Sequence, residues 1–140
     1  DVCSSDLVTA SHRPLRAFEF DATHCPDLFP ALAALAAAAQ GESVIRGTSR
    51  LEHKECNRAD AIREEYAKAG IEVDISQEDV MRIRGGRIRA ARVQSHGDHR
   101  MAMSMAVAGL LSDGEMTIED AECVAKSYPG FFEDLEKIRI

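Results

Sequence analysis

The feature that most constrains the fold is an order of strands and helices that occurs twice along the chain. Hydrophobic periodicity over residues 17–85 predicts strand, helix, strand, helix, strand, strand, and residues 86–140 begin the same order again without its closing pair of strands. A repeat of roughly 70 residues with this order predicts an α/β (α+β) fold built from βαβαββ units. We therefore expect a partial domain over 8–140, with repeat one at about 17–85 and an incomplete repeat two at about 86–140.

The individual elements follow from apolar spacing and from Gly and Pro positions. The first helix has Leu28, Leu32 and Leu35 as a candidate buried stripe and Asp27 as its candidate N-cap. The helix that starts at Asp98 is apolar nearly all round and is expected to be buried. The predicted strands cover 17–20, 43–47, 71–76, 79–85, 87–95 and 115–120, and the predicted helices cover 25–41, 54–70, 98–111 and 128–138, with Phe131, Phe132 and Leu135 expected in the core.

Composition narrows the classes of partner. The net charge of −7 argues against a nucleic-acid or membrane-surface partner, although a local group of cations can still bind a small anion. The chain has no apolar run long enough to span a membrane, and its four scattered cysteines are typical of free thiols in a cytoplasmic protein. The first seven residues, DVCSSDL, lack periodicity and read like the translated end of a sequencing adapter, so we expect residues 1–7 to be non-native.

Charged residues gather where predicted strands give way to helices. In HKECNR, Lys54 and Glu55 precede Arg58 by one helical turn. Such a hexamer is most often an ordinary solvated helix face with an Arg–Glu pair. Its position at a helix N-terminus also allows an anion site, because free backbone N–H groups point outward there.

The stretch QSHGDHRMAMSMAVAG, residues 94–109, allows three readings. Asp98 can cap the following helix and pair with a cation, and His99 and Arg100 can bind an anion in the first helical turn. A metal site is the third reading, but His96, Asp98 and His99 lie across a glycine bend and lack the usual spacing of zinc ligands.

These charged clusters are expected to lie on one side of the fold. Asp27, Arg58 and Arg100 all occur at strand-to-helix junctions, and Lys126 follows a predicted strand. In repeated α/β units such junctions collect on one side, so we expect the charges to converge and to bind a polyanion such as a phosphate or carboxylate.

Four segments, in this order, resemble the C-terminal part of the 5-enolpyruvylshikimate-3-phosphate synthase (3-phosphoshikimate 1-carboxyvinyltransferase) family. They are CPDLFPALAALAA, LEHKECNRADAI, SHGDHRMAMSMAVAG and MTIEDAECVAKSYPGFFEDL, and the likeness extends over residues 18–138. The resemblance implies an inside-out α/β barrel fold, of which the chain would form about two of the three units of one domain. It also implies transfer of the enolpyruvyl group of phosphoenolpyruvate to the 5-hydroxyl of shikimate 3-phosphate in aromatic amino acid biosynthesis, by addition and elimination with no metal or other cofactor.

The matching motifs also imply roles for individual residues. Asp27 would hold or deprotonate the shikimate hydroxyl, Lys54 would assist this proton transfer, and Glu55 would exchange protons with the methylene carbon of phosphoenolpyruvate. Phosphoenolpyruvate would be bound by Arg58, His99, Arg100 and Lys126.

Departures from the family pattern and the short length of the chain lower the activity that the resemblance implies. Asn57 stands where the family usually has Asp, which removes an expected partner of Arg58 or Lys54, and Arg50 stands where some members have a substrate-contacting Asn and is assigned no role. Because the N-terminal substrate-binding residues are missing, we expect the fragment to be inactive alone. The alternatives are a relative that acts on UDP-N-acetylglucosamine and a non-catalytic anion- or metal-binding module.

Overall fold

The computed structural model describes residues 7–138, in which two sheets enclose a layer of helices. Within each half the elements follow the predicted order, although the division into two repeats stays a prediction. The strands are β1 (Glu19–Asp21), β2 (Glu42–Arg46), β3 (Glu72–Asp74), β4 (Val80–Arg84), β5 (Ala91–Gln94) and β6 (Met116–Glu119). The α-helices are α1 (Phe29–Ala38), α2 (Arg58–Lys68), α3 (His99–Gly109) and α4 (Phe131–Ile138), and the 3-10 helices are η2 (Pro26–Leu28), η3 (Thr48–Arg50) and η4 (Ala121–Lys126).

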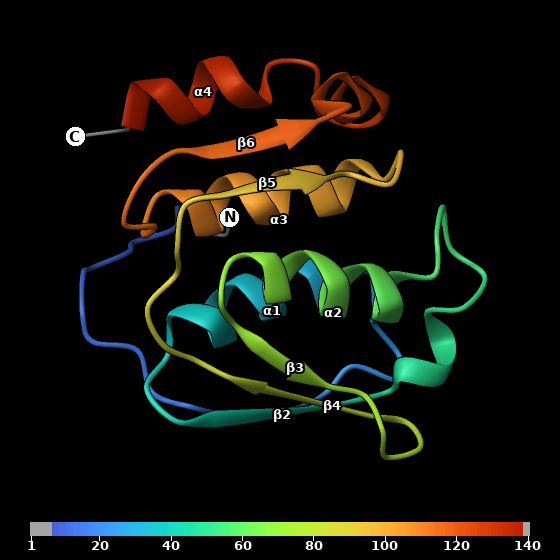
Figure 1. Ribbon diagram of the computed structural model, residues 1–140. Helices are drawn as coiled ribbons and strands as arrows, with labels where there is room; N and C mark the ends of the chain where they lie inside the picture. The colour runs from blue at the N-terminus through green and yellow to red at the C-terminus, as the bar shows by residue number, and fades with distance from the viewer. Residues whose placement is uncertain (1–6, 139–140) are drawn as a thin grey trace, which may run out of the picture.

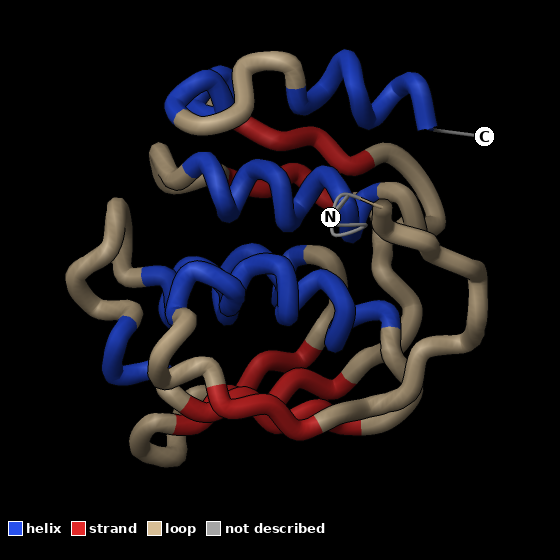
Figure 2. Tube along the Cα trace, turned by 180° about the vertical axis from the view of Figure 1, so that it is seen from behind, coloured by secondary structure: helices blue, strands red, loops and turns tan. Residues whose placement is uncertain are grey.

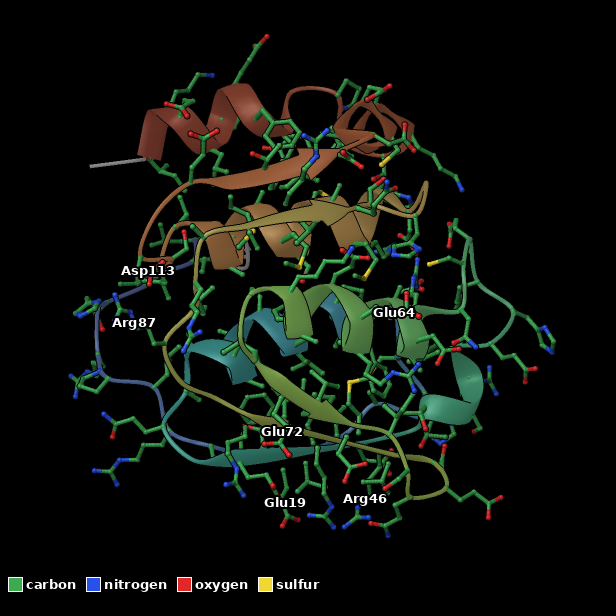
Figure 3. The ribbon with its side chains drawn as sticks, in the orientation of Figure 1. Glu19, Arg46, Glu64, Glu72, Arg87 and Asp113 are labelled. Atoms are coloured by element: carbon green, nitrogen blue, oxygen red, sulfur yellow. The ribbon has the colours of Figure 1, made fainter. Side chains whose placement is uncertain are left out.

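The larger sheet has the strand order β1-β2-β4-β3. β1 pairs with β2 in parallel, and β4 runs antiparallel to both β2 and β3, with Ile45 opposite Met81. Both of these side chains are fully buried. The opposite face of this sheet carries charged side chains, among them Glu19 and Glu72, which point away from the helices (Figure 3). The larger sheet is therefore apolar on its helix-facing side and polar on the outside.

The smaller sheet pairs β5 with β6 in parallel, and α3 connects the two strands. Helices α1, α2 and α3 lie between the two sheets, whereas α4 covers the outer face of the smaller sheet (Figures 1 and 2). One buried polar network joins the three inner helices. The Ser104 hydroxyl donates to the Pro30 carbonyl at 2.6 Å and lies 2.5 Å from the Tyr66 hydroxyl.

The inner face of α1 differs from the predicted leucine stripe. Leu28 is 44% exposed and Leu35 is 48% exposed, so the prediction that they are buried is wrong. The buried side of α1 consists of Phe29, Pro30 and the small residues Ala33, Ala34, Ala36 and Ala37. Small side chains let neighbouring helices pack closely, and this requirement outweighs leucine hydrophobicity.

Three further expectations need correction. The helix predicted from residue 54 begins only at Arg58, because Asn57 caps it by accepting the Asp60 N–H. The helix after Asp98 is buried along its first turns, but Val107 is 43% exposed and Leu111 61%. In α4, Phe131, Phe132 and Leu135 are half-buried rather than in the core.

Among residues 7–138, no helix is both long and apolar enough to cross a membrane. Residues 1–6 of the expected non-native segment lie outside the described residues.

Candidate active site

Four separate segments bring the predicted site residues together. Asp27 lies in η2, and Lys54 and Glu55 lie in the loop before α2. Arg58 is the first residue of α2, and His99 and Arg100 open α3. Lys126 is the last residue of η4 rather than the sequel to a strand. The cluster thus draws on both halves of the chain, as the junction argument predicts.

Arg58 is the centre of this cluster. Its side chain is only 1% exposed, and its guanidinium donates to three carboxylates. Nε donates to Asp98 Oδ2 at 2.6 Å, Nη1 to Asp27 Oδ1 at 2.7 Å and Nη2 to Glu55 Oε2 at 2.8 Å. Burial lowers the pKa of Arg58, but the hydrogen bonds to Asp98 and Asp27 outweigh this and raise it above its ordinary value. Arg58 therefore stays charged and joins η2, the loop before α2 and the start of α3, whereas Lys126 of η4 joins the cluster through Glu55.

Asp98 does more than the sequence indicates. It is the N-cap of α3, as predicted, because its side chain accepts the Arg100 N–H at 2.9 Å. It is also fully buried and forms the deepest partner of Arg58. The Cys56 thiol points at the same carboxylate, with Sγ 3.6 Å from Oδ2, and burial raises its pKa to about 12. Nothing in the spacing of Arg58 and Asp98, forty residues apart, singles out this pair.

Asp27 does not cap α1, contrary to prediction. It lies inside η2, and the α1 N-cap is Leu28, which makes no side-chain capping hydrogen bond. The Asp27 carboxylate instead faces the cations, with Lys54 Nζ at 3.1 Å and Arg100 Nη2 at 3.7 Å in addition to Arg58. The hydrogen bond from Arg58 is the main reason that the pKa of Asp27 lies below its ordinary value. Asp27 is thus an ionised hydrogen-bond acceptor at neutral pH.

Glu55 lies between two cations. Its Oε1 accepts from Lys126 Nζ at 3.0 Å, and its Oε2 accepts from Arg58. The hydrogen bond from Lys126 is the largest cause that lowers the pKa of Glu55 to about 2. Glu55 can therefore give up a proton to a substrate only after these partners have moved.

His99 and Asn57 differ in their contacts from the other members. His99 is 5% exposed, and within the described part of the chain its Nδ1 has no hydrogen-bond partner. A buried polar atom in this state is suited to a ligand that supplies the missing hydrogen bond. Asn57 caps α2, and the carboxylates that contact Arg58 come from other positions. The effect of Asn in place of Asp at position 57 stays a prediction.

The structure does not bring His96, Asp98 and His99 together as ligands of one metal ion. His96 pairs with Glu65, and Asp98 pairs with Arg58. Over residues 7–138, the one group of three side chains close enough to share a metal ion is Glu64, Glu65 and His96. The buried Glu65 in that group already accepts from Lys68 Nζ at 2.6 Å.

Comparison with known proteins places this geometry in a family. A family model described as EPSP synthase (3-phosphoshikimate 1-carboxyvinyltransferase) matches residues 3–135. The chain belongs to the EPSP synthase family. The match begins inside the segment 1–7, whose origin stays a prediction.

Relatives of the EPSP synthase family are substantially longer than this chain. The 3-phosphoshikimate 1-carboxyvinyltransferase of Methanocella arvoryzae is 43% identical over 94% of the chain, which corresponds to 31% of that relative. The enzyme of the same name from Thermococcus kodakarensis is 43% identical over 95% of the chain and 33% of its own length. The chain thus spans about a third of the relatives it matches.

Solved structures agree with the fold assignment. EPSP synthase from Acinetobacter baumannii superimposes with a TM-score of 0.72 at 36% identity, covering 78% of this chain and 26% of that one. The enolpyruvyl transferase NikO from Streptomyces tendae gives a TM-score of 0.67 at 26% identity, covering 90% and 28% respectively. The predicted α/β enolpyruvyltransferase fold is confirmed.

Proposed function

We propose that this chain forms part of an enzyme that transfers the enolpyruvyl group of phosphoenolpyruvate to the 5-hydroxyl of shikimate 3-phosphate. The observation that carries this proposal is the meeting of three further cations and three carboxylates around one buried guanidinium, Arg58. Exposed cations can bind a phosphate and a carboxylate, and adjacent carboxylates can handle protons. The names of the relatives favour shikimate 3-phosphate over the UDP-N-acetylglucosamine alternative.

The exposed cations are suited to the anionic groups of phosphoenolpyruvate. The Lys126 side chain is 60% exposed and that of Arg100 is 40% exposed, whereas Arg58 is buried. We infer that Arg100 and Lys126 meet the phosphate and carboxylate first. Arg58 follows when the incoming anion replaces one of its carboxylate partners, and the free Nδ1 of His99 adds a hydrogen bond.

We propose the following roles for these residues in the reaction. In the addition step, Asp27 accepts the proton of the 5-hydroxyl, with Lys54 beside it, the hydroxyl oxygen bonds to C2 of phosphoenolpyruvate, and protonated Glu55 donates its proton to C3. In the elimination step, Glu55 takes a proton back from the C3 methyl group, the C2–C3 double bond returns, and the bond from C2 to the phosphate oxygen breaks. The departing phosphate takes the proton that Asp27 holds, which restores both carboxyl groups to their starting states. The cations stabilise the charge that develops on the departing phosphate.

Binding of phosphoenolpyruvate would also prepare Glu55 for proton transfer. Lys126 and Arg58 hold the pKa of this carboxyl at about 2 before substrate binds. When the substrate anion draws these cations away, the carboxylate loses the hydrogen bonds that stabilise its charge, and its pKa rises. Glu55 then becomes able to exchange a proton at neutral pH.

We further propose that the chain works only together with the remainder of a longer protein, in the cytoplasm. A groove of about 410 Å³ runs between α1 and α3, with Asp27 and Arg100 among its lining residues. Its other walls are apolar and include the exposed side chains of Leu35, Val107 and Leu111. An exposed apolar groove of this kind is typical of a surface that packs against other protein.

A chimera tests the proposed function. The chain replaces the corresponding third of the Methanocella arvoryzae relative, and phosphate release from phosphoenolpyruvate and shikimate 3-phosphate is measured. We expect turnover in the chimera and none in the chain alone, and loss of turnover in the chimera on Glu55→Gln. A folded chimera without turnover would contradict the proposal, as would stoichiometric zinc binding by a chain that binds neither substrate.

A further inference from the structure

The turn between β5 and α3 has an unusual backbone. His96 has a φ of 56°, in the left-handed region, and Gly97 follows with a φ of 68°. A residue with a Cβ rarely adopts this conformation and keeps it where surrounding contacts fix it. The turn leads directly into Asp98 and Arg100, so its conformation sets where these side chains start.

A buried carboxylate contacts this turn on both sides of Ser95. Glu65 of α2 is 1% exposed. Its Oε1 lies 2.7 Å from His96 Nε2, and its Oε2 accepts the Gln94 backbone N–H at 2.9 Å. Lys68, one turn further along α2, neutralises the carboxylate. Together these hydrogen bonds outweigh burial and lower the pKa of Glu65, so the group is an ionised acceptor.

The same helix holds the far end of the turn. Arg58 precedes Glu65 by seven residues, or two helical turns, so both side chains lie on one face of α2. Arg58 binds Asp98 just after the turn, and Glu65 binds Gln94 before the turn and His96 within it. Helix α2 therefore fixes the turn at both ends.

We propose that Glu65 is a positioning residue for the charged cluster, because its contacts with Gln94 and His96 hold the turn that places Asp98 and Arg100. Its effect on the backbone can be measured without any ligand. Its effect on phosphoenolpyruvate binding rests on the proposed function.

The principal test compares Glu65→Gln with the matched control Glu64→Gln in the chain described here. Glu64 is the preceding residue on α2, labelled in Figure 3, and its side chain is 54% exposed. Nuclear magnetic resonance measures solvent exchange of the Arg58 Nε–H and of the backbone amides of 97–100. We expect exchange to accelerate about tenfold or more in Glu65→Gln, the effect of weakening a charge-assisted hydrogen bond, and less than twofold in the control.

Local and global effects are separated within the same spectra. Amides of α1, such as Ala36, report global opening, and a merely structural role of Glu65 would accelerate them in parallel with the turn. His96→Asn is the second variant, because Asn tolerates left-handed backbone but is too short to replace the imidazole. His96→Asn should accelerate exchange of the amides in the turn, while the Gln94 amide keeps its hydrogen bond to Glu65. If Glu65→Gln does not fold, the result with His96→Asn decides whether the contact between Glu65 and His96 holds the turn.

The proposal is overturned if turn exchange stays within twofold of wild type in the folded variants, or if α1 exchange rises equally. Titration of the chimera with phosphoenolpyruvate adds the functional arm, for which we expect about tenfold weaker binding in the chimera that carries Glu65→Gln and no change in the one that carries Glu64→Gln. A folded chimera with the wild-type chain that fails to bind phosphoenolpyruvate would count against the proposed function only, because the exchange measurements stand by themselves.

Discussion

Replacing Arg58 with methionine tests whether one buried guanidinium holds the charged cluster together. Methionine keeps a similar length and apolar stem but removes the donors to Asp98, Asp27 and Glu55. Asp98 is fully buried and would keep only the Arg100 N–H and the Cys56 thiol as partners. The variant therefore leaves a buried carboxylate without its compensating charge.

This geometry sets the expected loss in free energy of unfolding for Arg58→Met. Removing one partner of a buried ion pair costs about 3–5 kcal/mol, since the remaining charge cannot regain its hydration. Asp27 is 49% exposed, and its contact with Arg58 adds little because water screens it. A loss of about 3–5 kcal/mol is a large part of the roughly 5–15 kcal/mol that stabilises an ordinary domain.

A double variant separates the buried charge from the lost packing. In Arg58→Met with Asp98→Ser, a hydroxyl can still cap α3 and no buried carboxylate remains. The free energy of unfolding is measured by urea titration with circular dichroism as the signal. That of the double variant should lie within about 2 kcal/mol of wild type and above that of Arg58→Met. The reasoning is refuted if Arg58→Met loses less than about 1 kcal/mol, or if adding Asp98→Ser brings no recovery.

Other properties of the chain can be checked in the same way. Ser104→Ala should lower the free energy of unfolding by about 1–3 kcal/mol in urea titrations, because it leaves the buried Tyr66 hydroxyl without its Ser104 partner; equal stability would contradict this. The pKa of Glu55 is lowered to about 2, so its ionised form stabilises the fold above pH 4.5 and this contribution is lost as the pH falls towards 2. Wild type should therefore exceed Glu55→Gln in free energy of unfolding by about 1–2 kcal/mol at neutral pH, and this difference should shrink towards zero as the pH falls towards 2. A difference that stays constant with pH would refute the prediction. The Cys56 thiol, with a pKa of about 12, should resist iodoacetamide at pH 8, as mass spectrometry of peptides can show. Rapid modification in the folded chain would contradict this raised pKa of a half-buried thiol beside Asp98.

Element order and the capping of α3 were within reach of sequence reasoning because both depend on local pattern. Alternating apolar residues predict β4, and an Asp before an apolar run predicts the N-cap that Asp98 provides. The convergence of Arg58, Arg100 and Lys126 also followed from topology, since each lies near a junction between elements. These features need no knowledge of which side chains touch.

Pairings between distant residues were beyond the same reasoning. Asp27 was expected to cap α1, but a short 3-10 helix intervenes and turns its carboxylate towards Arg58 and Lys54. Helix α1 buries alanines instead of Leu35, because close helix packing decides which face is inside. Spacing along one segment carries no information about these contacts, which depend on the distance between helices and, for Asp27, on partners 27 and 31 residues away.

Within the charged cluster around Arg58, each exposed cation is already paired, and this changes how anion binding by this acidic chain should be understood. Lys54, Arg100 and Lys126 each contact a carboxylate of the chain itself, and Arg58 contacts three. A substrate anion must therefore exchange with Asp27 or Glu55 instead of meeting a free positive site. Four cations against three carboxylates leave a local excess of one positive charge in a chain of net charge −7. Exchange of this kind costs little desolvation, because both the old and the new partner of each cation are anionic oxygens.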